Sequence, residues 1–566
     1  MFSHRRFRKF CKWNVLFLAA ISLAVPVAHA QQNGFIQKKL IETGWDKPDT
    51  ARLRANLAQM EQSPFDGVVI SAIGKDDAGK PVYMLATFSS EPWKQEWFQN
   101  CVDDLKAIHP KKLTDNFITV GSNPGNVDFF DDAGWKQIVD HCRIAAWIAE
   151  EGNLKGILFD PEAYTHPYSQ FDFGTQAQRD KHTFDQYQAK ARQRGKEMIA
   201  AMAAVDPNLV ILTYFMDSTT AAAANSTNPQ LELLTSYSNL YPSFINGWLD
   251  AAPASMTFVD GCESQGYRAN SPLDYAQAAN LVRNSALSLV APENRQKYRA
   301  QVQASSGLYL DAYSNAPGSY WYIDPKGATP TQRLQANLKS ALHAADEYVW
   351  VYDEQYRWWP TPNESVKPEN WEDKLPGIGD AMLGLTHPDL MIEQKLAEFE
   401  KNGKLINLLQ NGDFSAPPDT TPSYWSVWQQ SGSPGTLTQD VSVSHQNDKS
   451  GSAKLSAVKS GFLMQAINAK PSETYIVQAW NRQVGKGSIW VRVRWETAAG
   501  DWTDADSDTS FFADKSTVDA NGWQRIQGVV TVPANAGKLV VLLASANQAS
   551  AQDVVWFDDV RVFKVQ

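Results

Sequence analysis

The sequence predicts an α/β fold in two parts, a (β/α)8 TIM barrel followed by an all-β jelly-roll sandwich. Between residues 38 and 356, short apolar runs alternate with amphipathic segments, which is typical of parallel strands joined by helices. From about residue 404 the pattern changes to period-2 alternation with Gly, Asn, Asp and Ser turns. A chain of 566 residues is too long for one ordinary core, so we expect two domains.

Residues 1–30 have the composition of a signal peptide. Basic side chains dominate the first twelve positions, an apolar run covers residues 13–27, and Ala28-His29-Ala30 has the small-x-small pattern of a cleavage site. No later run is apolar for long enough to span a bilayer. We therefore expect a mature chain that begins near Gln31 and is secreted or periplasmic.

The charge of the chain argues against two classes of partner. The formal net charge is −10. The signal peptide contains Lys and Arg but no Asp or Glu, so the mature chain is more acidic still. Nucleic acid and anionic membrane are therefore not expected as partners.

The mature chain keeps three cysteines, an odd number, and the spacing of Cys101, Cys142 and Cys262 matches no metal motif. A Cys101–Cys142 disulfide is open, but buried free thiols are favoured.

The barrel elements follow one another at regular intervals. The predicted strands are Lys39–Gly44, Gly67–Ile73, Phe117–Gly121, Gly156–Asp160, Leu209–Phe215, Met256–Asp260, Gly307–Asp311 and Tyr348–Asp353. The clearest predicted helices are Thr50–Gln62, Trp93–Ile108, Trp135–Glu151, Asp185–Ala204, Tyr275–Ser288, Thr331–Ala345, Trp371–Leu385 and Asp389–Asn402. A hairpin of Val69-Ile70 with Tyr83–Thr87 is expected after the second strand.

The fourth strand ends in two carboxylates. Because side chains alternate along a strand, Asp160 and Glu162 point the same way, and in one pocket they would push each other's pKa values apart. The other reading is a pair of acids that caps a helix or meets an Arg. Active sites of such barrels lie where strands end, and here those ends are rich in acids and aromatic rings.

Paired carboxylates of this kind suit acid–base cleavage of a sugar linkage. Glu162 is the expected proton donor and Glu263 its leading partner, with Asp160, Asp311 and Glu354 as further candidates. The carboxylate separation that tells retention from inversion is open, as are the sugar, the linkage and endo or exo action. The side chains expected to bind substrate at this rim are Trp45, Tyr164, His166, Tyr267, Tyr313, Trp321 and Trp358.

The second part is a set of alternating strands. Its clearest strands are Thr474–Arg482, Ser488–Glu496, Trp523–Val532, Lys538–Ala544 and Val554–Phe563. Trp480 and Trp490 lie on the strands at Thr474–Arg482 and Ser488–Glu496, which we expect to be neighbours and to carry a glycan-binding face rich in Arg. An ordinary sheet surface with Arg stacked on Trp is the alternative.

Three segments of this part resemble jelly-roll carbohydrate-binding modules of the family 4/9/22 type. Asn411-Gly-Asp-Phe414 resembles the opening motif, Tyr475–Arg482 the central strand and Val555–Val560 the closing strand. The resemblance covers residues 404–566 and implies a possible structural Ca²⁺, for which Asp413, Asp558 and Asp559 are the candidate ligands. Ser415 departs from the acidic residue common after the Phe, and the acids could instead make turn hydrogen bonds.

The barrel as a whole resembles the catalytic domains of glycoside hydrolases. Lys155–Glu162 is loosely similar to the strand-four motif of family 18 chitinases, in which a Glu donates the proton and the Asp two residues before it orients the substrate. Lys155, Leu158 and Pro161 depart from that motif, so the family stays open. Together with the signal peptide over residues 1–30, the resemblances imply a catalytic barrel over residues 31–403 and a carbohydrate-binding module over residues 404–566, with no cofactor for catalysis.

Two other functions fit parts of the sequence. A non-catalytic polysaccharide-binding protein would keep the cleft and lack the chemistry. A metal-dependent hydrolase would need clustered His ligands, and His166 is the main candidate at the rim, because His141, His343 and His387 fall in or beside helices. The expected partner in each case is a polysaccharide or oligosaccharide, and the oligomeric state is open.

Overall fold

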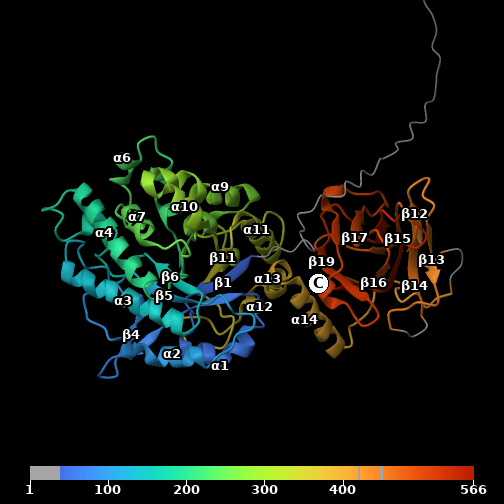
Figure 1. The fold of residues 1–566 in the computed structure, drawn as a ribbon, viewed down its shortest axis with the longest axis horizontal. Coiled ribbons are helices and arrows are strands. Elements are labelled where there is room, and N and C mark those ends of the chain that lie inside the picture. Colours follow the sequence, from blue (N-terminus) through green and yellow to red (C-terminus); the bar gives the residue numbers. More distant parts are fainter. Residues whose placement is uncertain (1–37, 418–420, 447–449, 566) are drawn as a thin grey trace, which may run out of the picture.

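The computed structural model describes residues 38–417, 421–446 and 450–565. Figure 1 shows two parts: helices packed around a curled sheet, and a smaller β part with helix α14 (Pro388–Lys401) at their junction. The predicted signal peptide lies outside the described residues. None of the described helices is long and apolar enough to cross a membrane.

The first part is built on a parallel sheet. Its strands, in spatial order, are β10 (Gly307–Tyr309), β11 (Tyr348–Asp353), β1 (Lys39–Gly44), β2 (Gly67–Ile70), β5 (Phe117–Gly121), β6 (Gly156–Asp160), β7 (Val210–Thr213), β8 (Thr257–Asp260) and β9 (Val302–Ala304). Each predicted strand therefore holds a strand of this sheet. Because every strand runs the same way, their carboxyl ends meet at one edge.

The two outermost strands of this order are consecutive in the chain. Only Ser305 and Ser306 separate β9 from β10. The Ser305 N–H donates to the carbonyl of Asp260, the last residue of β8, at 3.0 Å, and the Ser306 carbonyl accepts from the Trp350 N–H of β11 at 3.3 Å. The sheet is thus curled so far that the segment Ser305-Ser306 forms hydrogen bonds with strands near both ends of the strand order.

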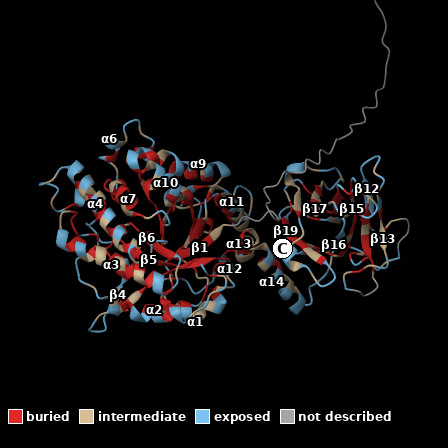
Figure 2. Ribbon diagram, in the orientation of Figure 1, coloured by how far each residue is buried: buried red, intermediate tan, exposed pale blue. Residues whose placement is uncertain are grey.

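Helices cover the outer face of the curled sheet (Figure 1). They are α1 (Thr50–Met60), α2 (Gln99–Lys106), α3 (Asp132–Glu151), α4 (Phe184–Ala203), α5 (Ala221–Ala224), α6 (Pro229–Leu233), α7 (Tyr241–Ala251), α8 (Glu263–Arg268), α9 (Pro272–Arg283), α10 (Arg295–Gln301), α11 (Pro330–Ala344), α12 (Trp371–Lys374) and α13 (Ile378–Thr386). The apolar sides of most of these helices join the strands in one core, while α5 and α6 contribute to a small separate cluster; Figure 2 shows buried residues along the strands and exposed ones on the outer turns.

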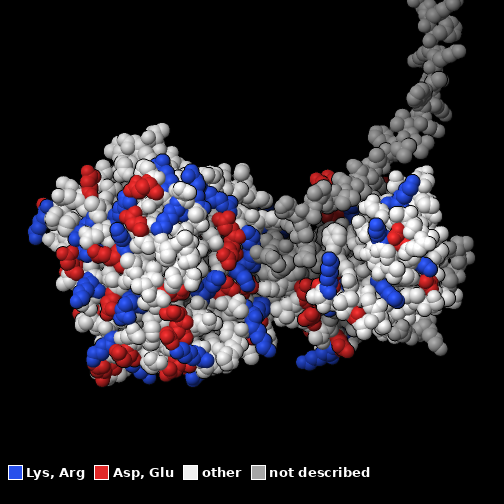
Figure 3. Space-filling model, viewed as in Figure 1, with Lys and Arg blue, Asp and Glu red and all other residues white. Residues whose placement is uncertain are grey.

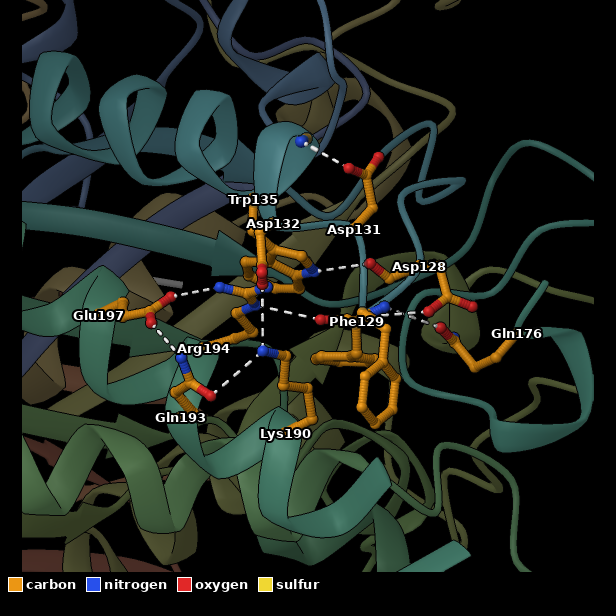
Figure 4. Close-up of polar contacts among 12 residues, drawn as sticks. Asp128, Phe129, Asp131, Asp132, Trp135, Gln176, Lys190, Gln193, Arg194 and Glu197 are labelled. Carbon is orange, nitrogen blue, oxygen red and sulfur yellow. Dashed lines mark hydrogen bonds and ion pairs between the residues drawn. The ribbon is translucent and has the colours of Figure 1, made fainter. Parts of the chain in front are cut away.

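Local sequence explains where the long helices begin and how they are held. Thr183 forms a capping box with Gln186 at the start of α4, which satisfies backbone donors that a helix start leaves open. Arg194, buried on α4, donates to the Phe129 carbonyl at 3.1 Å and pairs with Asp132 at the start of α3 (Figure 4). The acid at a helix start and the buried cation together fix α3 against α4.

Three predicted elements of the first part differ in the structure. The hairpin forms from β3 (Ile73–Lys75) and β4 (Pro81–Tyr83), so its first strand lies later and its second strand earlier than expected. The predicted helix at Trp371–Leu385 is divided into α12 and α13, because Gly377 between them has a φ of 78°. The seventh predicted strand ends at Tyr309, and Asp311 lies in a short 3-10 turn.

The second part consists of two antiparallel sheets in the described residues. One has the order β12 (Ser426–Gln429), β15 (Ser460–Asn468), β20 (Lys538–Ala546), β17 (Ser488–Glu496), β18 (Thr509–Phe511). The other has the order β13 (Thr436–Asp440), β14 (Ser452–Ser456), β21 (Val554–Lys564), β16 (Thr474–Val484), β19 (Trp523–Thr531). Their inner faces form a common core. The prediction of a mixed α/β part followed by an antiparallel sandwich is confirmed.

One expectation about the sandwich is wrong. We expected the strands that carry Trp480 and Trp490 to be neighbours, but β16 and β17 belong to different sheets. The chain crosses from one sheet to the other through the turn at Gly485–Gly487, and both of these glycines have a positive φ. Sequential strands pair often but not always, and here alternation alone did not reveal the crossing.

Helix α14 joins the two parts by packing on the outer face of the second sheet. Ile392 meets Ile476 and Phe563, and all three side chains are buried. Gln527 Nε2 donates to Asp389 Oδ1 at 2.6 Å beside this contact. On the side of the first part, Lys395 pairs with Asp380 of α13 at 2.7 Å. The linking helix is thus held from both sides.

The structure also places the three cysteines and the charged surface residues of the first part. Cys101, Cys142 and Cys262 are free and buried, so the expectation of buried thiols is confirmed. Figure 3 shows Lys and Arg intermixed with Asp and Glu on the visible face of the helical part.

Candidate functional site

Two carboxylates and a tyrosine meet where β6 ends. The Tyr164 hydroxyl lies 3.0 Å from Asp160 Oδ2 and 2.5 Å from Glu162 Oε2. Asp160 Oδ1 also accepts the backbone N–H of Glu162 at 3.0 Å. Both carboxylates therefore lie on the same side of the chain, as the alternation along the strand predicts. Burial, and then the charge of Glu162, raise the pKa of Asp160 above its usual range.

Glu263 joins this pair from two strands away. It is the first residue of α8, and Cys262 before it has a φ of 48°, which turns the chain sharply after β8. Asp260 holds that turn by accepting the Cys262 N–H at 3.0 Å and the Ser218 hydroxyl at 2.5 Å. Burial, followed by the charges of Glu162 and Asp160, raises the pKa of Glu263.

A third acid group comes from β10 and β11. Asp311 Oδ2 accepts the Glu354 N–H at 2.9 Å, and the Tyr309 hydroxyl donates to Glu354 Oε2 at 2.8 Å. Burial raises the pKa of Asp311 to about 6. Tyr352 lies near both groups of acids. Burial, and then the charges of Glu354, Glu162 and Asp160, raise the pKa of its hydroxyl. Asp311 is fully buried and holds the loop, whereas Glu354 reaches the mouth of the sheet.

The structure adds two charged residues that sequence reasoning did not include. Glu42 is buried on β1, and burial followed by the charge of Asp46 raises its pKa. Lys47 donates to the Gly44 carbonyl at 2.6 Å; burial lowers its pKa, while Asp160, Glu42 and Asp353 oppose that shift. One sequence signal was available for both residues: Glu42 lies inside a predicted strand, and Lys47 follows the end of that strand closely.

The aromatic residues predicted to bind substrate divide into two groups. Trp45 and Tyr164 are more than half exposed, His166 is exposed, and Trp321 packs by its edge against Tyr267 at 5.5 Å. Tyr267 itself is buried beside Glu263. The other two have structural contacts. Tyr313 accepts from Asn337 of α11 at 2.9 Å, and Trp358 donates to Asp353 at 2.8 Å while packing on Phe65.

The histidines do not gather at this mouth. His141 stacks on Trp93, His343 is exposed on α11, and His387 contacts Asp66 at 2.8 Å. Within residues 38–417, 421–446 and 450–565, no group of three or more His, Cys, Asp or Glu side chains is arranged to hold a metal ion. The donor set of a metal-dependent hydrolase is thus not brought together by these residues.

A second candidate site lies on the sandwich. Trp428, Phe462, Ala544 and Trp490 are register partners across β12, β15, β20 and β17, so they form one row on the outer face of their sheet. Trp428 and Phe462 stack at 5.0 Å. A hollow of about 620 Å³ continues along the same face. Such a row of rings beside a hollow suits a sugar chain.

The arginines of this face are already engaged. Arg492 and Arg494 each donate to Asp508 Oδ2 at 2.8 Å, and Arg494 lies 4.3 Å above the Trp502 ring. Trp480 is on the other sheet, stacked on His445 at 4.1 Å. Trp480 and Trp490 therefore do not share a face, and the ring of Trp480 is covered on one side.

The carboxylates predicted to hold Ca²⁺ have other contacts. Asp413 accepts the Ser415 hydroxyl at 3.0 Å within its own turn. Asp558 accepts the His445 N–H at 2.7 Å, and Asp559 contacts both His445 and Arg561. Three carboxylates do not converge on one point here, and calcium binding stays a prediction for a metal titration.

Comparison with known proteins identifies one region. Residues 406–550 match the family model of a carbohydrate binding domain, CBM_4_9. No curated protein sequence matches the chain.

Solved structures show weak likeness over about a quarter of the chain. The enzymatically active domain of tailspike protein 4 from bacteriophage CBA120 is 16% identical with a TM-score of 0.23, covering 28% of this chain and 22% of that one. The module TmCBM61 in complex with beta-1,4-galactotriose is 15% identical with a TM-score of 0.20, covering 28% and 99%. The xylan-binding CBM22-1 domain of Paenibacillus barcinonensis is 13% identical with a TM-score of 0.20, covering 27% and 92%. Residues 406–550 are, by the family match, a carbohydrate-binding domain.

Proposed function

We propose that this chain is a secreted or periplasmic glycoside hydrolase, with a catalytic site at the mouth of a closed (β/α)8 barrel. The observation that carries the proposal is the convergence of Asp160, Glu162 and Glu263 from β6 and the turn after β8. Glycoside cleavage needs one carboxylic acid that donates a proton and one carboxylate that acts as nucleophile or base. Burial and neighbouring carboxylates raise the pKa values of Asp160 and Glu263, which supports a proton donor within this group.

The roles of the two glutamates are exchanged relative to the sequence-based expectation. Glu263 is the better proton donor, because burial and the nearby charges raise its pKa and keep it protonated near neutral pH. Glu162 is then the proposed nucleophile or base. The Tyr164 hydroxyl lies within hydrogen-bond distance of both Asp160 Oδ2, at 3.0 Å, and Glu162 Oε2, at 2.5 Å. Tyr164 thereby orients the Glu162 side chain.

The carbohydrate-binding domain would deliver the polymer to this site. The row of rings on the β12–β18 sheet is its proposed contact, and Trp45 and Trp321 are the proposed sugar platforms at the mouth. An acidic exported chain with such a domain fits a polysaccharide substrate outside the cytoplasm. Purified secreted protein that begins at Gln31 would test the export.

The test of catalysis is digestion of a glycan panel by wild type, E162Q and E263Q, with product anomers followed by NMR. Glu162→Gln and Glu263→Gln are each expected to lower kcat by about 10²–10⁴, the range for lost acid–base catalysis. The matched control is D185N, another loss of one carboxylate charge; it lies on the outer start of α4 and is expected to leave kcat unchanged. Undiminished activity in either glutamine variant would contradict the assignment.

A non-catalytic polysaccharide-binding protein is the second candidate. The observation that favours it is the family match of residues 406–550, which concerns binding alone. If wild type and E162Q both bind a glycan and neither cleaves any member of the panel, this second function replaces the first.

A further inference from the structure

Arg268 is a cation at the mouth that is held by aromatic rings. It is the last residue of α8, five positions after Glu263, and it is exposed. Its guanidinium carbon lies 4.7 Å from the ring centre of Tyr320 and 4.6 Å from that of Trp321, and it donates to the Tyr320 hydroxyl. Among the residues that the structure describes, no Asp or Glu forms an ion pair with it.

Trp321 connects Arg268 to the candidate catalytic group. The Trp321 ring packs by its edge on Tyr267 at 5.5 Å and on Tyr309 at 6.2 Å. Tyr309 in turn donates to Glu354 Oε2 at 2.8 Å. Arg268 is therefore one ring away from the tyrosines that contact the carboxylates, close enough to meet a neighbouring unit of the same bound chain.

The surroundings of Arg268 are open and polar. It borders a hollow of about 630 Å³ between α5, α8 and α9, lined by side-chain amides such as Asn225, Gln265 and Gln277. The acid in this wall, Asp274, accepts the Asn270 N–H at 2.9 Å. On its other side stands Tyr320, 76% exposed. A flat ring, an open guanidinium and amide groups together suit a sugar that carries a negative group.

The charges of the mouth make this position distinctive. The carboxyl groups gathered at the mouth offer an anionic substituent no cationic partner, and the cation Lys47 is turned toward the Gly44 carbonyl. We propose that Arg268, held between Tyr320 and Trp321, binds the anionic group of a substrate glycan, so that the substrate is an acidic polysaccharide. The inference rests on the proposed function, because it takes the mouth as the site where substrate binds.

Binding without turnover tests this inference. The full chain carrying E162Q and W490A is titrated calorimetrically with matched pairs: oligogalacturonate and hyaluronan oligosaccharides, each against its carboxyl-reduced neutral form, and dextran sulfate against dextran. W490A removes a proposed contact of the sandwich. R268Q and R268K are then added to this background, and thermal melting of each variant reports whether it is folded.

At least one charged member is expected to bind about tenfold or more tightly than its neutral counterpart, the factor of one charge-assisted hydrogen bond. R268Q should abolish that preference and R268K should keep part of it. The uronate and sulfate pairs tell which anionic group is recognised. Equal binding of both members of every pair, absence of binding included, would overturn the inference, as would a preference that survives R268Q. A wild-type chain that binds acidic glycans through Arg268 but cleaves none would contradict only the hydrolase.

Discussion

At the scale of residues, the candidate site depends on carboxylates that the fold forces close together. Asp160 is buried beside Glu162 and Tyr164, and its pKa is raised mainly by burial. Asp66 is the opposite case: burial opposes ionisation, but the His387 ring and the Leu40 N–H outweigh it and lower the pKa. These two aspartates should therefore give opposite dependences of stability on pH.

Asp160→Asn and Asp66→Asn test this sign. A carboxyl group with a raised pKa stabilises the fold below its unfolded pKa and loses that contribution as pH rises through the folded value. The free energy of unfolding of wild type minus that of D160N should therefore fall between about pH 4 and pH 8. This window runs from the pKa of an unfolded aspartate to just above the folded pKa of Asp160, which is about 7. The same difference for D66N should grow as pH rises from about 2 to 5. Urea unfolding across pH measures both; parallel curves for the two variants would refute the assigned environments.

Part of the site could be predicted from sequence because its residues are close in the chain. Asp160, Glu162 and Tyr164 follow one strand, and alternation alone places the two acids on one side. Glu42 and Lys47 were missed because their positions, inside a strand and just after it, do not by themselves show that both side chains are buried. The meeting of Glu263 with Glu162 needs the curl of the sheet, which depends on contacts far apart in sequence.

At the scale of elements, the strands were predictable and their interruptions were not. The seventh strand, expected at Gly307–Asp311, is shorter as β10, and β9 (Val302–Ala304), which was not predicted, precedes it; between them the Ser305 hydroxyl donates to the Tyr348 carbonyl at 2.7 Å. Gly377 divides a predicted helix, and the β16–β17 turn crosses between sheets. In each case local pattern gave the element type, and tertiary hydrogen bonding or a turn decided its limits.

Helix α14 gives a prediction at this scale. Ile392→Ala removes a fully buried side chain from the contact with Ile476 and Phe563, which should cost about 2–5 kcal/mol of the energy that couples the two parts. In calorimetry the sandwich should then melt as a separate transition from the first part. Leu405→Ala is the matched control, because Leu405 follows α14 and is exposed, so its melting should resemble wild type. Unchanged melting of I392A would show that α14 does not couple the parts.

At the scale of the whole molecule, an acidic mouth and a carbohydrate-binding domain are carried on one chain. The two tryptophans that were expected to share a surface separate here, since Trp490 belongs to the row of rings and Trp480 stacks on His445. This separation supplies a matched pair for testing which face of the sandwich binds glycan.

Trp490→Ala should weaken binding of the full chain to insoluble polysaccharide about tenfold, as loss of a stacked ring and its buried area predicts. Trp480→Ala should leave binding within about twofold of wild type, because that ring lies on the other sheet. Pull-down isotherms on a panel of insoluble glycans measure both. A larger loss in W480A than in W490A would move the binding face to the β13–β19 sheet.

The clamped helix between the parts also has a consequence for how a long polymer would be cut. Because α14 is held on both sides, by Lys395 to α13 and by Ile392 to the sandwich, the carbohydrate-binding domain and the proposed catalytic mouth stand at a set spacing. Under the proposed hydrolysis, a polysaccharide bound by the sandwich would be cut at a constant number of sugar units from the bound segment. The lengths of the products should therefore cluster around one value.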